Sequence, residues 1–243
     1  MPRPFFLVLS RRWLWAGVIL MGSLIVLALY GTFPLAIYTL NALPSEILYD
    51  VMLDPGHGGI DPGGIGRDEI YEKEFTLDIV LRMRRILETA GLRVGLTRDT
   101  DRDVSHLVKN GTRHRRDLLG RYKLMNQARL GMSIHTNAAR SSSERGAIVF
   151  YMKNSYIDRI YAQIAFDELE RVQEMNHQEI VPRDNLVLLK AKPPVLLIEV
   201  GFITNEQDLQ KLLDEGFREN VAQALSTAIL KFFAWQEGEQ SES

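Results

Sequence analysis

The chain has 243 residues, of which 46% are hydrophobic and 25% charged, and these fractions are typical of a globular rather than a disordered protein. Its formal net charge of -2 gives no electrostatic reason to expect a nucleic-acid partner. The absence of cysteine excludes disulfides, thiolate metal sites and cysteine nucleophiles, so any metal would need histidine and carboxylate ligands.

The N-terminal part of the chain predicts a membrane helix. No charged side chain occurs over residues 13–45, and the most apolar stretch, 13–30, approaches the roughly 20 residues that a helix needs to cross a bilayer. Arginines precede this stretch and acidic residues follow it, which puts the N-terminus in the cytoplasm. We therefore expect a cytoplasmic segment over 1–12, a transmembrane helix over 13–33 and a linker over 34–46. A cleaved signal peptide is the alternative, and either would deliver the rest of the chain outside the cell.

Strand and helix patterns alternate along residues 47–238, which we expect to fold as one domain. Short apolar runs predict strands over residues 49–53, 92–97, 131–135, 146–152, 185–189 and 195–200. Apolar residues at helical spacing predict helices over residues 72–90, 117–129, 156–175 and 221–235. Because strands such as VLLIEV are apolar on both sides, the pattern predicts an α/β fold with a central twisted sheet, mostly parallel or mixed, and helices on both faces. The polar tail over 239–243 is expected to be flexible.

Three side chains suited to binding a metal or a proton lie at the ends of predicted strands. His57 lies in DPGHGGIDPGG, His135 in SIHTN and Glu199 in LLIEVGFITN. Strand ends of an α/β sheet gather functional groups at one edge, and a buried carboxylate such as Glu199 needs a metal, a cation or a proton beside it. We interpret His57 as a metal ligand, His135 as a second ligand whose case depends on His57, and Glu199 as suited to the work of a general base. The alternatives are an ordinary turn at His57, a structural histidine at His135 and a salt bridge at Glu199.

An acidic cluster at the start of the first predicted helix offers a further metal ligand. Its members are Asp68, Glu69, Glu72 and Glu74. Acidic residues in a first turn also complement the positive end of the helix dipole. Composition alone does not choose a ligand among them.

Together these motifs resemble those of the zinc-dependent N-acetylmuramoyl-L-alanine amidases, the amidase-3 family of cell-wall hydrolases. The resemblance spans about residues 49–235, with DPGHGG, a Glu-Lys pair, SIHTNA and IEVGFITN in the family's order. LTRDTDRDV and RYKLMNQA are also similar to family sequences. The resemblance implies zinc ligands at His57, Glu72 and His135, and the Glu-Lys pair selects Glu72 from the acidic cluster. It also implies that Glu199 is the catalytic carboxylate.

The resemblance implies that the chain hydrolyses the amide bond between N-acetylmuramic acid and L-alanine in peptidoglycan. The catalytic domain, residues 47–238, would face the wall, anchored in the cell membrane or secreted if the N-terminal segment is cleaved. The anchor and the runs RHRRDLLGRYKLMN and KPPVLLIEVGF are most similar to the sporulation and germination-specific branch, which acts on spore cortex. We interpret Asn137 as a residue that orients His135 or the substrate.

Two other functions remain open at the level of the sequence. One is a wall-binding relative that has lost activity, and the other is a different zinc hydrolase of the wall, such as a polysaccharide deacetylase. An activating protein partner is also left open.

Overall fold

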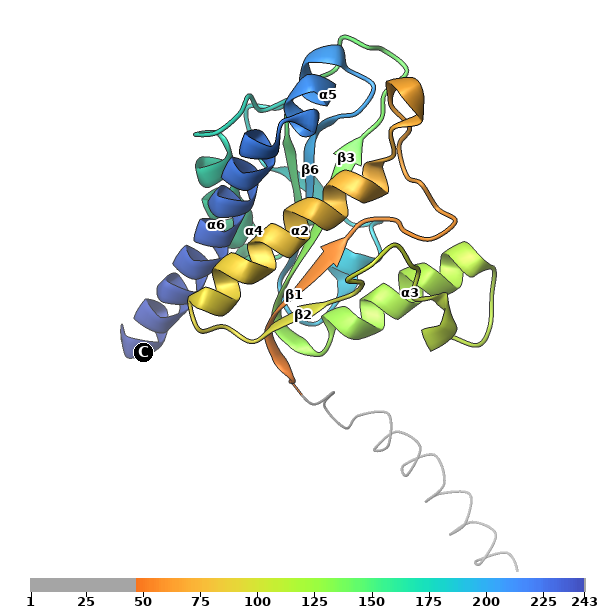
Figure 1. The fold of residues 1–243 in the computed structure, drawn as a ribbon. Coiled ribbons are helices and arrows are strands. Elements are labelled where there is room, and N and C mark those ends of the chain that lie inside the picture. The colour runs from red at the N-terminus through yellow and green to blue at the C-terminus, as the bar shows by residue number, and fades with distance from the viewer. Residues whose placement is uncertain (1–46, 243) are drawn as a thin grey trace, which may run out of the picture. The chain divides into compact units, whose positions relative to one another are not determined.

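The computed structural model describes residues 47–242, which form an α/β domain (Figure 1). The expected cytoplasmic segment 1–12, transmembrane helix 13–33 and linker 34–46 lie outside the described residues and stay predictions. Among the helices of residues 47–242, none combines the length and the apolar character needed to span a membrane.

In the described part of the chain, six strands form one sheet with the order β2-β1-β3-β6-β4-β5. The strands are β1 (Tyr49–Pro55), β2 (Val94–Leu96), β3 (Ala128–Asn137), β4 (Ile148–Met152), β5 (Val181–Arg183) and β6 (Val195–Phe202). Strands β2, β1, β3 and β6 are parallel neighbours, β4 is antiparallel to β6, and β5 is parallel to β4. The sheet is therefore mixed, one of the two arrangements that the sequence predicted.

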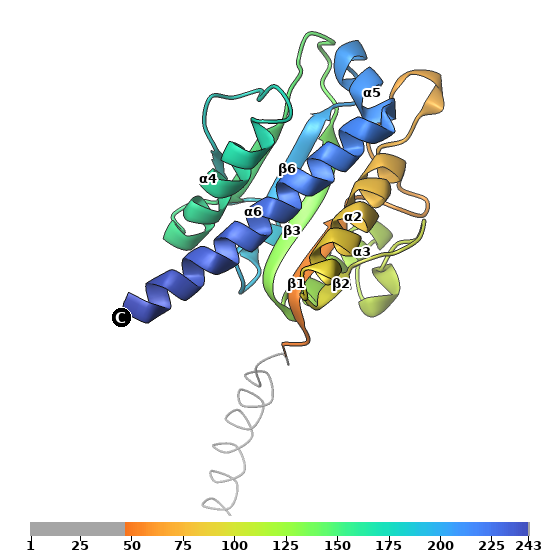
Figure 2. The ribbon, with the colours of Figure 1, turned by 60° about the vertical axis from the view of Figure 1, so that its left-hand side comes forward.

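Helices cover both faces of the sheet, as predicted. They are α2 (Glu72–Thr89), α3 (Arg113–Met125), α4 (Tyr156–Leu169), α5 (Glu206–Leu213) and α6 (Glu215–Glu242), with short 3₁₀ helices η1 (Arg67–Glu69), η2 (Ser105–Leu107) and η3 (Leu188–Lys190). Figure 2 shows α2, α6 and α4 side by side on one face, where α2 buries Phe75, Ile79 and Met83 along one side. On the other face, Met125 of α3 and Leu188 of η3 join a second apolar cluster.

The predicted strand over 185–189 is wrong. Strand β5 ends at Arg183, and the apolar run continues into η3. Leu188 and Leu189 are nonetheless buried against the sheet. A short apolar run indicates burial, and a 3₁₀ turn satisfies that burial as well as a strand does.

Two helices begin before their predicted bounds, and the first of them, α3, also ends earlier, at Met125 instead of residue 129. Helix α3 begins at Arg113 instead of residue 117, because the side chain of Thr112 caps it by accepting a hydrogen bond from the N–H of Arg115. Helix α6 runs over Glu215–Glu242 and so includes residues 239–242 of the expected flexible tail.

The parallel arrangement brings the carboxyl ends of β1, β3 and β6 to one edge of the sheet. Strand β1 leads into the glycine-rich loop that contains His57, and β3 ends at Asn137. The β3–β6 register is regular up to the pair His135 and Glu199 and then shifts by a bulge. Bulges occur often beside active sites, where they redirect side chains.

Candidate metal centre

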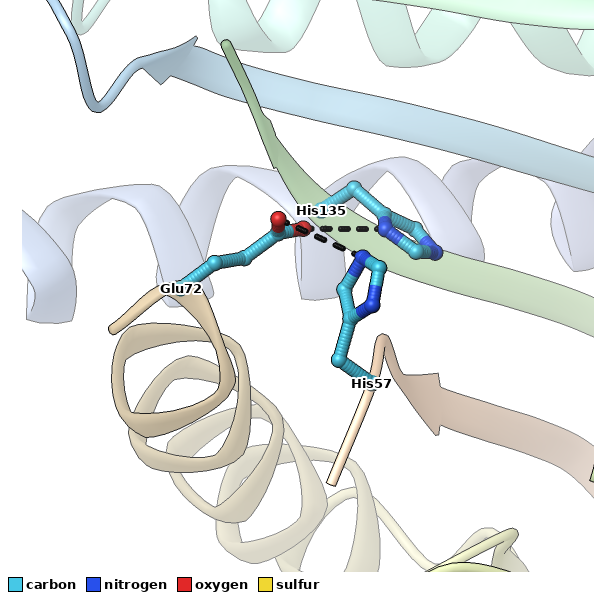
Figure 3. Close-up of side chains that lie close together, drawn as sticks. All are labelled: His57, Glu72 and His135. Carbon is cyan, nitrogen blue, oxygen red and sulfur yellow. Dashed lines mark hydrogen bonds and ion pairs between the residues drawn. The ribbon is translucent and has the colours of Figure 1, made fainter. Parts of the chain in front are cut away.

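Three of the predicted site residues meet at this edge (Figure 3). His57 follows β1, Glu72 is the first residue of α2, and His135 lies near the end of β3. One ligand atom from each lies within 4.8 Å of the others. Nε2 of His57 is 3.3 Å from Oε2 of Glu72, and Nδ1 of His135 is 3.0 Å from Oε1 of the same carboxylate.

The donor set and its spacing fit a zinc ion. Zn²⁺ binds imidazole nitrogen and carboxylate oxygen at about 2.0–2.2 Å in tetrahedral geometry. Two ligand atoms of such an ion lie about 3.3 Å apart, which is close to the 3.3 and 3.0 Å that separate Glu72 from the two histidines. Three protein donors also leave one position open, as in catalytic zinc sites.

Glu72 is the most buried of the three side chains, with 3% of its side-chain surface exposed. The N–H groups of Gly64 and Thr136 donate hydrogen bonds to its two oxygens, at 2.7 and 2.9 Å. Burial raises the pKa of Glu72, but the bonds to His135 and His57 outweigh burial and hold its pKa well below the usual range. The carboxylate is therefore ionised and suited to a cation.

Two glycines leave room for the ligands. A Cβ atom on Gly56 would clash with the imidazole ring of His135. A Cβ atom on Gly63 would lie 2.5 Å from Oε2 of Glu72, and Gly63 also has a φ of 71°, which side-chain-bearing residues rarely adopt. The glycine-rich sequence around His57 is thus required by close packing as well as by the turn itself.

Glu199, the predicted catalytic carboxylate, lies directly across from His135 on the neighbouring strand. Paired residues of adjacent strands point to the same face of a sheet, so Glu199 and His135 share one side. The Oε2 atom of Glu199 is buried and has no hydrogen-bond partner within residues 47–242. Burial raises the pKa of Glu199 to about 7. The structure therefore places a buried carboxyl oxygen without a hydrogen-bond partner on the residue opposite His135.

The sequence matches one protein family over most of the described domain. Residues 51–231 match the family described as N-acetylmuramoyl-L-alanine amidase. The chain belongs to this family. The family predicted from the motifs is therefore confirmed, and with it an amidase function in cell-wall hydrolysis.

Individual relatives of this amidase agree with the family match. The germination-specific N-acetylmuramoyl-L-alanine amidase of Bacillus subtilis is 34% identical over 196 residues, 79% of this chain and 81% of the relative. The CwlD amidase from Clostridioides difficile, solved in complex with the GerS lipoprotein, is 36% identical with a TM-score of 0.70, covering 76% of this chain and 98% of the other. The catalytic domain of CwlV from Bacillus (Paenibacillus) polymyxa is 27% identical with a TM-score of 0.65, covering 76% and 97%.

Two arginines of the amidase that the motifs left without a role hold the loop that contains His57. The first is Arg98, in the run LTRDTDRDV, which is 1% exposed. Its guanidinium donates to the carbonyl oxygens of Pro55 at 3.0 Å and Gly56 at 2.8 Å, and also to that of Lys73 at 2.9 Å. Burial lowers the pKa of Arg98 to about 10, so it stays protonated at neutral pH. It ties the loop to the first turn of α2.

The second is Arg121, in the run RYKLMNQA of α3. It donates to the carbonyl oxygens of Pro55 and His57 and pairs with the buried carboxylates of Asp54 at 2.6 Å and Asp117 at 2.8 Å. Burial raises the pKa of Asp54, but the charge of Arg121 and hydrogen bonds from Ser133 and Thr97 lower it to about 2. The spacing of Asp117 and Arg121, four residues apart on one helix face, is the signal that could have identified this pair from the sequence.

These contacts account for an unusual backbone at the first ligand. His57 has a φ of 60°, a conformation that residues other than glycine seldom adopt. The backbone strain at His57 persists because surrounding groups fix the loop on both sides.

The imidazole of His57 also has a shifted pKa. Burial lowers the pKa of His57, yet its bonds to Glu72 and Asp61 raise that pKa to about 9 in the absence of metal.

Asn137 lies at the end of β3, near His135 in sequence. Its Oδ1 accepts a hydrogen bond from the N–H of Ala138 at 2.8 Å, which shapes the turn after the strand. Its expected role in orienting His135 or the substrate stays a prediction.

A cavity of about 250 Å³ opens beside the metal centre, between α3 and the segment 185–188. Its polar lining includes His57, Asp61 and His135. Its apolar walls are Leu118, Leu186, Val187, Leu188 and Leu197. A substrate group can therefore reach the candidate metal ligands from this side.

Proposed function

We propose that the chain is a zinc-dependent amidase that hydrolyses the bond between N-acetylmuramic acid and L-alanine of the peptidoglycan stem peptide. The observation that carries this proposal is the meeting of His57, Glu72 and His135 within 4.8 Å, with Glu199 paired across from His135. Membership of the amidase family supports the choice of this bond.

In this proposal His57, Glu72 and His135 hold the ion through two nitrogens and one oxygen. Bound there, Zn²⁺ supplies Lewis-acid chemistry, which polarises a carbonyl group and makes water more acidic. The short contacts of Gly64 and Thr136 to Glu72 keep its carboxylate fixed, and the neutral imidazoles complete the donor set. The cavity between α3 and residues 185–188 receives the substrate beside these ligands.

Glu199 acts as the general base and acid. Its carboxylate takes a proton from the attacking water, the water oxygen bonds to the carbonyl carbon, and the proton passes to the amine nitrogen as the carbon–nitrogen bond breaks. A group that first accepts and then donates a proton works best with a pKa near the working pH. The pKa of about 7 that burial gives Glu199 supports this role.

The test of this function is to replace Glu199 by glutamine in the full chain and digest purified peptidoglycan. We expect Glu199→Gln to bind one zinc per chain and to lose activity by about 10²–10⁴-fold, with mass spectrometry showing few stem peptides that begin with L-alanine. The exposed Glu74→Gln near the start of α2 is the matched control and should keep its activity.

Other outcomes would favour the rival functions. Release of acetate instead of peptides would indicate a polysaccharide deacetylase. A zinc-loaded wild-type protein that binds peptidoglycan and releases nothing would indicate an inactive wall-binding relative. Substantial activity of Glu199→Gln would contradict the role proposed for that residue.

We also propose the stage at which this amidase acts, its location and a protein partner. The similarity to a germination-specific amidase of Bacillus subtilis supports action on spore cortex. The apolar segment 13–33 supports a membrane anchor with residues 47–238 facing the wall. Because the similar CwlD amidase was solved with the GerS lipoprotein, a protein partner of this amidase is a further expectation.

A further inference from the structure

The loop after His57 turns back on itself within four residues. Gly58 and Gly59 have φ values of 126° and 62°, which glycine adopts without strain. The N–H of Gly58 donates to the carbonyl oxygen of Asp61 at 3.0 Å, and the N–H of Asp61 donates to that of Gly58 at 3.2 Å. The turn brings the side chain of Asp61 back to the imidazole of His57.

The two ring nitrogens of His57 face different carboxylates. Nε2 lies 3.3 Å from Glu72, on the side of the metal centre, whereas Nδ1 lies 3.1 Å from Oδ2 of Asp61. The other oxygen of Asp61 accepts a hydrogen bond from the N–H of Gly63 at 3.2 Å. These two contacts fix the carboxylate of Asp61, and because its side chain is only 22% exposed it is largely shielded from water.

We propose that Asp61 is a positioning residue for the metal centre. It accepts the hydrogen of Nδ1–H of His57, which selects the tautomer whose Nε2 lone pair points toward Glu72 and the ion. The same bond fixes the angle of the ring. Carboxylates that hold a metal-binding histidine in this way raise its basicity and its affinity for the ion. The inference rests on the proposed zinc site and assigns to it a residue that the sequence left without a role.

Asp61 does not serve as a fourth ligand. The group of residues whose donor atoms approach one another consists of His57, Glu72 and His135 within the described chain. Asp61 binds the nitrogen that points away from this group. Its effect on the ion therefore acts through His57.

The experiment measures zinc affinity of the full chain by competition with a chelator. We expect Asp61→Ala to bind zinc about 10–100-fold more weakly than the wild type. Asp61→Asn should lose less, because its amide oxygen still accepts the hydrogen of Nδ1. The control is Asp68→Asn, which removes the same charge from an exposed position in the same loop and should leave the affinity unchanged.

Two further readouts separate a positioning role from a structural one. Thermal unfolding of the metal-free Asp61→Ala should show only a small loss, because Asp61 is paired with His57 in the absence of metal, and the visible spectrum of bound Co²⁺ should change for Asp61→Ala but not for Asp68→Asn. Equal zinc affinity of Asp61→Ala and wild type would overturn the inference. A lower thermal midpoint with unchanged affinity would also overturn it. A wild type that binds no zinc at all would instead refute the proposed function, and the inference with it.

Discussion

The two histidines of the metal centre are held in place in different ways. His135 lies on β3, which pairs with β1 on one side and β6 on the other, so the sheet itself fixes its backbone. His57 lies in a loop with a φ of 60°, and the guanidinium groups of Arg98 and Arg121 hold the carbonyl oxygens around it. A ligand on a central strand needs no dedicated side chain to place it, whereas a ligand on a strained loop depends on buried charges from distant parts of the chain.

This comparison predicts that single substitutions disrupt the part of the metal centre around His57 more easily than the part around His135. The support around His57 is ionic and buried, and a buried charge that loses its partner destabilises the fold strongly. The part around His135 is supported by many backbone hydrogen bonds, none of which depends on one side chain. Two substitutions and one change of pH test this difference.

The largest effect is expected from Arg121→Met. The substitution removes the buried cation that pairs with Asp54 and the donor to the carbonyl oxygen of His57, which should cost about 3–5 kcal/mol of the free energy of unfolding. Urea denaturation measures this loss. The control is Arg84→Met, which removes an exposed pair with Glu88 and should cost less than about 0.5 kcal/mol. Equal effects of the two substitutions would contradict the importance of the buried pair.

A smaller effect is expected from pH through Asp54. Its pKa in the folded protein, about 2, lies below that of an unfolded aspartate, so its ionised form stabilises the fold above pH ~4. This contribution, roughly 2 kcal/mol, is lost as the pH falls from about 4 to about 2. We expect the difference in unfolding free energy between wild type and Asp54→Asn to shrink over that range. A difference that does not depend on pH would show that the charge of Asp54 does not stabilise the fold.

The smallest effect on stability is expected from Gly63→Ala. Its positive φ should cost about 1–2 kcal/mol, and the added Cβ would press on Oε2 of Glu72. The control is Gly91→Ala, where φ is 90° but the added Cβ would meet no atom within 4 Å. We expect a loss in unfolding free energy at least as large for Gly63→Ala as for Gly91→Ala, and weaker zinc binding for Gly63→Ala alone. Unchanged zinc affinity of Gly63→Ala would argue against the tight packing around Glu72.

The sequence predicted much of this architecture from local patterns. Apolar runs indicated β1, β3 and β6, and Glu199 attracted attention because it is a single charge in such a run. The strand over 185–189 was wrong because the same apolar run satisfies burial as a 3₁₀ turn. The meeting of His57 with His135 followed from the expectation that parallel strands end at one edge.

Arg98, Arg121 and Asp61 were not predicted, although all three lie in motifs that the sequence analysis quoted. Arg98 and Arg121 are far from His57 along the chain, and their runs contain many exposed charges that look alike in one dimension. Asp61 is close to His57, but whether it faces the ring depends on the turn made by Gly58 and Gly59.

The sequence by itself determined the family, the four candidate site residues and the alternation of strands and helices, because these depend on residue types and spacing. Only the tertiary structure decided which charges support the loop and which ring nitrogen faces the metal centre. Those contacts depend on where distant backbone segments cross and on how a glycine turn directs one carboxylate, and neither is a property of the local pattern. Both histidine ligands were therefore visible in the sequence, whereas the contacts that hold the loop around His57 required the fold.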